Sequence, residues 1–212
     1  MYNQEQFIVM KETIVLMGKQ TCTAVEKAIS ALLINDITAA SEVRRIEKEV
    51  DELFAFVDKH CLDTLAEGEY SRGQLVFLLN SLKIAIELER ICDYANQIAK
   101  LVQRKFSQQD MQEIDRLAII VSIMKTEVAG MLQCAVKAYE FLDLGLIAGI
   151  QARENIVDEK TKEVFRGILC ILSINQWVQE LVLDYHVAVR YVERTADRAL
   201  NITEFVSAIV KV

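Results

Sequence analysis

Proline is absent from this chain of 212 residues, and glycine occurs only seven times. Proline and glycine are the residues that most often interrupt helices and build tight turns. Their scarcity argues against a loop-rich β-sandwich and favours long uninterrupted helices. Hydrophobic residues make up 52% of the chain, which is enough for a substantial core and too many for a disordered protein. We therefore predict an all-α protein.

Positive charge is also scarce, because 24 Lys and Arg residues stand against 31 Asp and Glu residues and the net charge is −7. Nucleic-acid-binding domains usually carry a basic patch, so we expect no nucleic-acid partner. The five cysteines are scattered without a CxxC pair, which is typical of reduced thiols in the cytosol. The N-terminal residues lack a signal-peptide pattern, and we find no charge-free apolar run of about 18 residues. We predict a cytoplasmic protein without a transmembrane segment.

Apolar residues recur at helical spacing along most of the chain. The expected helices span about 5–33, 36–65, 74–105 and 112–141, with two more beginning near Asp143 and Asn175. Asp36 is a suitable N-cap for the second helix. Polar or glycine-containing segments at 67–73 and 107–110 are the clearest connections between helices.

The second half of the chain repeats the pattern of the first. Asp36 and Asp143 are 107 residues apart, as are Asp51 and Asp158, whereas Glu89 and Glu193 are 104 apart. We interpret the difference as a loss of three residues in the second copy, in a shorter connection at 167–173. A duplicated three-helix unit tolerates such a change between helices. We predict two tandem three-helix bundles, residues 1–106 and 107–212.

Four acidic pairs with acid-x-x-x-Asp spacing recur at equivalent positions of the two copies. They are Glu47/Asp51 and Glu154/Asp158 on the middle helices, and Glu89/Asp93 and Glu193/Asp197 on the last helices. Residues four apart lie on one helix face, with Cβ atoms about 5–6 Å apart. Three other acidic pairs at this spacing have no counterpart in the other copy: Asp63/Glu67, Glu159/Glu163 and Glu180/Asp184.

The recurring acids admit two interpretations. They could be solvated faces of long helices, balanced by neighbouring arginines. Alternatively, each bundle brings two pairs together into an oxygen-rich group that holds cations. Carboxylates without thiolate or imidazole suit hard ions such as Mg²⁺, Mn²⁺, Ca²⁺ or ferric iron. With only two histidines, and neither of them at a Glu-x-x-His spacing, a histidine-rich zinc site or a ferritin-like di-iron site is disfavoured.

Other residues give no functional signal. Cys92 lies within one acidic motif, but Ala196 takes its place in the second copy, which favours a packing role. Asn96 and Asn201 do not fall at equivalent positions, so we assign neither of them a role. No phosphate-binding glycine loop, nucleophile elbow or Cys/His couple is present. We predict no catalytic site.

Two segments resemble the repeated Glu-Arg-Ile-Gly-Asp-His/Arg-Ala motif of the PhoU family of phosphate-uptake regulators: ERICDYA at 89–95 and ERTADRA at 193–199. The segment LMG at 16–18 is similar to the family's first helix. EVD at 49–51 and IVD at 156–158 are similar to its middle helix. The resemblance covers essentially the whole chain, in the same order in both copies. The chain departs from the motif at Cys92 and Ala196, where the family has glycine.

The resemblance implies two three-helix bundles whose acidic motifs hold multinuclear metal clusters, of iron or zinc, with manganese or magnesium as alternatives. The implied ligands are Glu47, Asp51, Glu89 and Asp93 in one bundle and Glu154, Asp158, Glu193 and Asp197 in the other. The implied role is non-catalytic. When phosphate is plentiful, such a protein acts on the ATPase subunit of a phosphate transporter and on the sensor histidine kinase that controls phosphate-starvation genes.

Two other functions stay open at this point. One is a helical adaptor, or a companion of another phosphate carrier, whose acids bind no metal. The other is a metal-dependent hydrolase, which needs an open coordination position and an acid–base residue nearby. We can name no such residue. The apolar composition also predicts a homo-oligomer, such as a homodimer.

Overall fold

The structure is a computed structural model that describes residues 2–66, 68–102, 114–174 and 179–212. These residues form long α-helices and one short 3₁₀ helix, with no strand among them. The elements are α1 (Tyr2–Ile34), α2 (Ile37–Ala66), α3 (Arg72–Leu101), α5 (Asp115–Phe141), η1 (Leu144–Ile147), α6 (Ile150–Ile174) and α7 (Gln179–Val210). The prediction of an all-α protein is confirmed.

Two helices of the first repeat, α2 and α3, begin with side-chain caps. The Oδ1 atom of Asp36 accepts hydrogen bonds from the backbone N–H groups of Thr38 and Ala39, at 2.9 and 3.0 Å. This is the predicted N-cap of α2. At the start of α3, Ser71 and Gln74 form a capping box, in which each side chain accepts a hydrogen bond from the backbone N–H of the other residue. Both caps satisfy N–H groups that a helix leaves unpaired.

The second repeat begins its middle helix later than predicted. Asp143 caps η1, accepting a hydrogen bond from the Gly145 N–H at 2.8 Å, and α6 starts only at Ile150. The intervening Gly149 has a φ of 82°, a conformation that glycine adopts readily and that breaks a helix. The expectation that Asp143 opens the long helix was therefore wrong. The glycines at 145 and 149 weaken helix formation in this segment.

The segment 167–173, predicted as a shortened connection, lies inside α6. A Cβ atom at Gly167 would lie 2.6 Å from the Leu117 side chain, so this glycine allows α6 to approach α5 closely. A single glycine inside a helix is tolerated where packing compensates for its weak propensity. The predicted start of the last helix near Asn175 and the repeat boundary between 106 and 107 lie outside the described residues.

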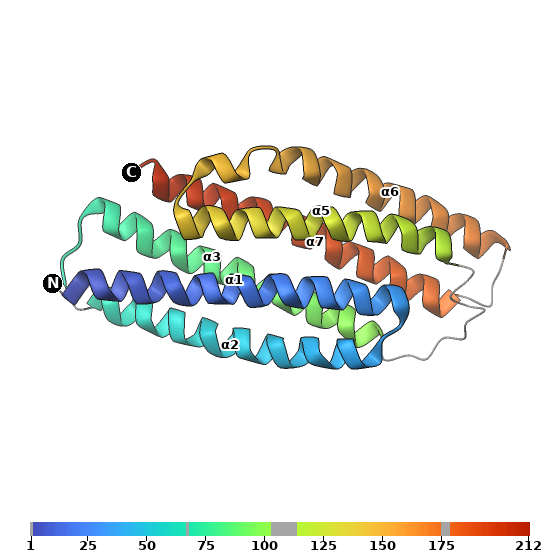
Figure 1. The fold of residues 1–212 in the computed structure, drawn as a ribbon, viewed down its shortest axis with the longest axis horizontal. Helices are drawn as coiled ribbons and strands as arrows, with labels where there is room; N and C mark the ends of the chain where they lie inside the picture. The colour runs from blue at the N-terminus through green and yellow to red at the C-terminus, as the bar shows by residue number, and fades with distance from the viewer. Residues whose placement is uncertain (1, 67, 103–113, 175–178) are drawn as a thin grey trace.

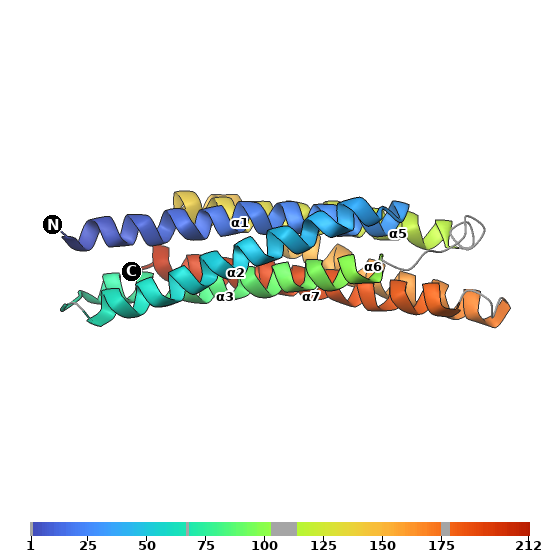
Figure 2. The ribbon, with the colours of Figure 1, turned by 90° about the horizontal axis from the view of Figure 1, so that it is seen from below.

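The helices form two three-helix bundles. Helices α1, α2 and α3 pack on one another, and so do α5, α6 and α7. In Figure 1, α2 and α6 run along opposite edges of the molecule, with α1, α3, α5 and α7 between them. Figure 2 shows that α1 and α5 form one layer and that α3 and α7 form the other. The prediction of two tandem three-helix bundles is confirmed.

An approximate two-fold axis relates the two bundles. The axis passes between α1 and α5 in one layer and between α3 and α7 in the other. Residues at equivalent positions of the two repeats contact each other there. Gln133 of α5 donates a hydrogen bond to Glu26 of α1, 107 positions earlier, at 2.9 Å. Arg198 of α7 donates to the hydroxyl of Tyr94 of α3, 104 positions earlier, at 3.0 Å. Both offsets match those of the internal repeat, so the duplication in the sequence is also a rotation in space.

The buried residues form one continuous core that both bundles share. Tyr139 of α5 is buried and donates a hydrogen bond to Ser81 of α3 at 2.7 Å, across the bundle boundary. Among the described helices, α5 is long and apolar enough by composition to cross a membrane. It packs against α1, α6 and α7, and a core helix of a folded protein passes the same test.

Candidate metal centre

In the first repeat, α2 and α3 bring acids from both motifs together. Carboxylate oxygens of Asp51, Glu89 and Asp93 all lie within 4.8 Å of one another, the one such group of three among the described residues. The four-residue spacing places each pair on one face of its helix. Val50 and Cys92, next to these acids in the sequence, are buried, and their packing turns the two acidic faces toward each other. We refer to Glu47, Asp51, Glu89 and Asp93 as the first acidic group.

Without a cation, the negative charges of the first acidic group are unfavourable, because the carboxylates are partly buried and repel one another. Burial raises the pKa of Asp51, Glu89 and Asp93 above the ordinary range, and neighbouring carboxylates of the group raise the pKa of each further. A raised carboxylate pKa means that the charged form is disfavoured at that place. A bound cation would reverse this, because it would favour the charged carboxylates.

Glu47 is held by Asn96, to which the sequence analysis assigned no role. The side-chain amide nitrogen of Asn96 donates a hydrogen bond to Glu47 Oε1 at 2.6 Å. Asn96 is only 5% exposed, and its Oδ1 atom is buried without a hydrogen-bond partner. It lies three positions after Asp93, on the same face of α3. That spacing was a usable signal, but Asn96 has no counterpart in the second repeat.

The second acidic group comprises Glu154, Asp158, Glu193 and Asp197. Burial raises the pKa of Glu154, and the charges of Asp158 and Asp197 raise it further. The pKa of Asp197 is likewise raised by burial, then by Glu193 and Asp158. The middle and last helices of this repeat therefore also turn their acids toward each other. The acids do not converge as closely as Asp51, Glu89 and Asp93 do among the described residues.

Local partners occupy two members of the second acidic group. Arg190 forms an ion pair with Glu193 at 2.6 Å, and the amide of Gln151 donates to Glu154 at 2.6 Å. Both partners lie on the same helix as the acid that they contact. Arg190 thus partly neutralises the second group, whereas Gln151 is uncharged. Among the described residues, no ion pair involves an acid of the first group.

Cys92 borders the first acidic group, but its thiol is not among the converging ligand atoms of Asp51, Glu89 and Asp93. Its side chain is fully buried, and burial together with the charges of Glu47, Asp51 and Asp93 raises the pKa of the thiol to about 12. The thiol therefore stays protonated at neutral pH. This agrees with the packing role predicted for Cys92.

A polar cluster joins the two repeats where α3 crosses α7. Arg198 of α7 pairs with Glu87 of α3 at 2.6 Å and contacts the Tyr94 hydroxyl, and Tyr94 packs on Tyr191 with 5.4 Å between ring centroids. The two-fold axis exchanges the Glu87–Arg198 contact with the Tyr191–Tyr94 contact. The contact on one side of the axis is therefore an ion pair, and the equivalent contact on the other side is a packing of two aromatic rings. The positive charge of Arg198 acts on both Glu89 and Asp197, one acid from each group.

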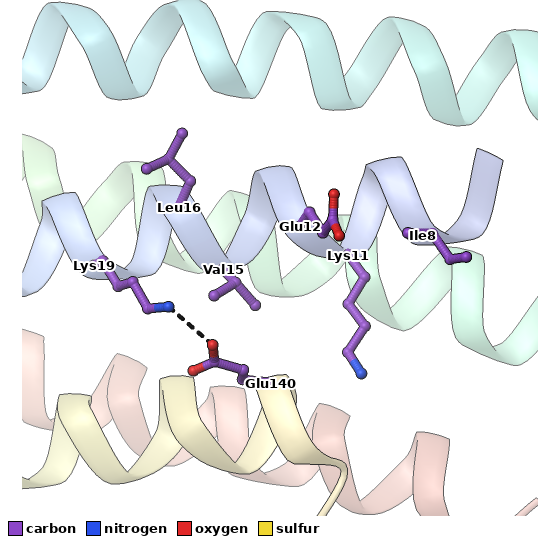
Figure 3. Close-up of a pocket in the computed structure, with 7 residues that line it drawn as sticks. All are labelled: Ile8, Lys11, Glu12, Val15, Leu16, Lys19 and Glu140. Carbon is purple, nitrogen blue, oxygen red and sulfur yellow. Dashed lines mark hydrogen bonds and ion pairs between the residues drawn. The ribbon is translucent and has the colours of Figure 1, made fainter. Parts of the chain in front are cut away.

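A pocket of about 520 Å³ lies elsewhere, between the first half of α1 and the end of α5. Figure 3 shows Lys19 of α1 reaching Glu140 of α5, with which it pairs at 2.9 Å, while Leu16 points away from α5. Ile8 and Leu16 are 55% and 47% exposed. The lining mixes apolar and oppositely charged side chains and contains no converging acids. We assign no chemistry to it.

The donor set of the acidic groups fits a hard cation. Carboxylate oxygens are the ligands of Mg²⁺, Mn²⁺, Ca²⁺ and ferric iron, whereas zinc favours nitrogen and sulfur. Both histidines are engaged elsewhere: His60 bonds to the Gln6 carbonyl and stacks on Phe56, and His186 packs on Phe165. The arrangement can therefore bind cations through oxygen alone and clamp a middle helix to a last helix.

The fold and the acidic groups define a class of protein: a duplicated three-helix bundle in which each repeat faces two acidic helix motifs toward each other. The family model described as the PhoU domain matches residues 14–102 and 121–206. The chain belongs to the PhoU family, and the resemblance inferred from its motifs is confirmed.

Named relatives and solved structures agree with this assignment. The phosphate-specific transport system accessory protein PhoU homolog of Pseudomonas aeruginosa is 26% identical over 202 residues, which are 95% of this chain and 82% of that protein. The Escherichia coli protein PhoU, a phosphate-specific transport system accessory protein, is 25% identical with the same coverage. The crystal structure of PhoU from Pseudomonas aeruginosa superposes with a TM-score of 0.89 at 25% identity, covering 98% of both chains. PhoU from Streptococcus pneumoniae, with a TM-score of 0.79 at 18% identity, shares the fold.

Proposed function

We propose that this chain is a non-catalytic accessory regulator of phosphate uptake and of phosphate-starvation signalling. The observation that carries the proposal is the match of the PhoU domain to both halves of the chain, together with relatives that are named as phosphate-specific transport system accessory proteins. The proposed partners are the ATPase subunit of a phosphate transporter and a sensor histidine kinase, reached at the cytoplasmic side of the membrane. Exposed apolar side chains on α1 and α5, including Ile8, Leu16 and Phe141, support the predicted self-association.

The proposal includes metal binding by both acidic groups. Bound cations would supply the positive charge that the facing carboxylates lack. Glu47 and Asp51 would hold the α2 side of the first group, and Glu89 and Asp93 would hold the α3 side. In the second group, Glu154 and Asp158 would hold the α6 side, and Glu193 and Asp197 would hold the α7 side. The donor set favours iron, manganese or magnesium over zinc.

In this proposal the metal has a structural and regulatory role. The carboxylates tie α2 to α3 and α6 to α7, so metal occupancy sets the rigidity of each bundle and of the surface that it presents to partners. A hydrolytic role would require an acid–base side chain beside an open coordination position. Among the described residues, both histidines bond or pack elsewhere. A helical adaptor without metal is the remaining alternative.

The test uses untagged wild-type protein and the double variant Asp93→Asn, Asp197→Asn. We expect more than one iron, manganese or magnesium ion per wild-type chain by elemental analysis and loss of most of it in the double variant. In cells that lack the chain, phosphate-starvation genes are expected to be expressed although phosphate is plentiful, and the wild-type chain restores their repression. The double variant restores it poorly.

The matched control is Glu159→Gln with Glu163→Gln, an acidic pair of α6 that has no counterpart in the first repeat. This control should keep both the metal and the repression. Absence of metal from the wild-type protein, with a melting temperature that added metal does not change, rules out metal binding and leaves the adaptor. Unchanged gene expression in cells without the chain rules out the regulatory role.

A further inference from the structure

The two acidic groups have the same spacing of acids, but the residues that contact those acids differ. Asn96 of the first repeat corresponds to Leu200 of the second, 104 positions later. The amide of Asn96 donates to Glu47 at 2.6 Å from the neighbouring helix. Leucine carries no donor, so Glu154 receives no hydrogen bond from the last helix of its repeat. It accepts one instead from Gln151, an exposed residue of its own helix, at 2.6 Å.

Asn96 is a fixed donor. Its side chain is 5% exposed, and helix packing surrounds it. Its Oδ1 atom is buried without a partner, which is an unfavourable arrangement for a polar atom. Among the described residues, the hydrogen bond to Glu47 is thus the one polar contact that the Asn96 side chain makes, and it links α3 to α2. A glutamate held in this way loses less side-chain entropy when it binds a ligand.

The donor also leaves the chemistry of Glu47 available. A neutral amide occupies one oxygen of the carboxylate and does not neutralise its charge, so the second oxygen can contact a cation. In the second group, by contrast, Glu193 is paired with the positively charged Arg190 at 2.6 Å. A cation that binds there must displace or share an existing counter-charge.

We propose that Asn96 is a positioning residue that orients Glu47 toward Asp51, Glu89 and Asp93, and that it makes the first acidic group the tighter of two unequal cation sites. The inference rests on the metal binding proposed above and adds an order of filling to it. The first group fills at low metal concentration. The second fills later, when Arg190 gives up Glu193.

The test is calorimetric titration of the chelator-treated full chain with Mn²⁺. The wild-type protein should show a tight and a weak class of site. Asn96→Leu, which installs the residue of the second repeat, should weaken the tight class by roughly tenfold or more, as removal of a hydrogen bond to a metal ligand usually does. The same variant should leave the melting temperature of the metal-free protein unchanged or raise it, because it removes a buried unpaired oxygen.

The opposite directions of these two readouts distinguish positioning from a general structural role. A structural role would lower the melting temperature of the metal-free protein along with the affinity. Arg190→Met is the matched variant for the second group, and it should tighten the weak class without changing the tight one. Wild-type affinity in Asn96→Leu, or equal weakening of both classes, overturns the inference. No Mn²⁺ binding by the wild-type protein contradicts the proposed metal binding itself.

Discussion

At the scale of single residues, the position of an acid relative to other helices decides its role. Acids four apart on an isolated helix repel each other by only about 0.2–0.5 kcal/mol, and water screens them. Asp93 also faces Glu47 and Asp51 on α2, and it is partly buried. It is this approach from a second helix that raises the pKa of the group and makes a cation favourable.

The first acidic group should destabilise the metal-free protein at neutral pH. The raised pKa of Asp93 means that the native state binds its proton more tightly than the unfolded state does. The destabilisation is therefore present above the native pKa and is lost as the pH falls through it toward the ordinary value near 3.9. With chelator present, we expect Asp93→Asn to stabilise the protein by roughly 0.5 kcal/mol at pH 7 and by less at pH 4, measured by urea unfolding.

Glu52→Gln is the control for this pH dependence, because Glu52 is an exposed acid on α2. It should change the free energy of unfolding little at either pH. A loss of stability in metal-free Asp93→Asn at pH 7 would show that the carboxylate makes a favourable contact there, and that the acids do not repel one another as described.

The eight acids could be selected from the sequence because two patterns coincided, helical spacing and recurrence in the duplicate. Asn96 could not be selected in the same way. Its partner Glu47 lies 49 positions earlier on another helix, and the contact depends on how α2 and α3 are packed. Recurrence was also the wrong criterion for Asn96, because a residue that makes the two groups unequal has no counterpart.

At the scale of helices, close approach explains where the small residues lie. A Cβ atom at Gly18 of α1 would lie 2.7 and 2.8 Å from the two Cγ atoms of Val136 of α5. Both branches of the valine face the glycine, and β-branched side chains have few alternative rotamers. Gly18 therefore sets the distance between α1 and α5, the helices through which the two repeats pack in this layer.

Gly18→Ala tests this contact. Alanine gains about 1 kcal/mol of helix propensity over glycine, but overpacking costs typically 1–3 kcal/mol. We expect a net loss of stability, and we expect Val136→Ala to recover part of it when the two changes are combined in a double-mutant cycle. The control is Gly73→Ala, where the nearest atom to a new Cβ is 3.6 Å away. That change should be neutral or stabilising, and additive effects of Gly18→Ala and Val136→Ala would contradict the contact.

The boundaries of the helices followed from the sequence only where capping chemistry determined them. Asp36 caps a long helix as predicted, but the equivalent Asp143 caps η1. The aspartate is the same, and the difference comes from the residues that follow. Gly145 and Gly149 make a short turn more favourable than a helix at that place, which recurrence of a single aspartate does not reveal.

At the scale of the molecule, the two bundles share a centre made of α1, α3, α5 and α7. The duplication predicted the bundles, but it could not predict that the equivalent helices of the two repeats would pack against each other. That arrangement depends on contacts such as Glu87–Arg198, whose symmetry counterpart is the Tyr191–Tyr94 contact. Because helices of both bundles contribute to one continuous core, neither bundle should unfold alone.

This cooperativity can be measured with Val57→Ala. Val57 is fully buried on α2, a helix that packs on α1 and α3 of the first bundle, and its truncation should cost on the order of 2 kcal/mol. Phe205→Trp in a Trp177→Phe background places the single tryptophan on α7, where Phe205 packs against the core, so its fluorescence reports on the second bundle. We expect the urea midpoint from this fluorescence to fall as much as the midpoint from circular dichroism, since coincident probes indicate one transition. Leu62→Ala, at a position of α2 that is 59% exposed, should shift neither midpoint.

A dichroism midpoint that falls while the fluorescence midpoint stays in place would show that the repeats unfold independently. Any metal-dependent stiffening would then be confined to the bundle that binds the ion.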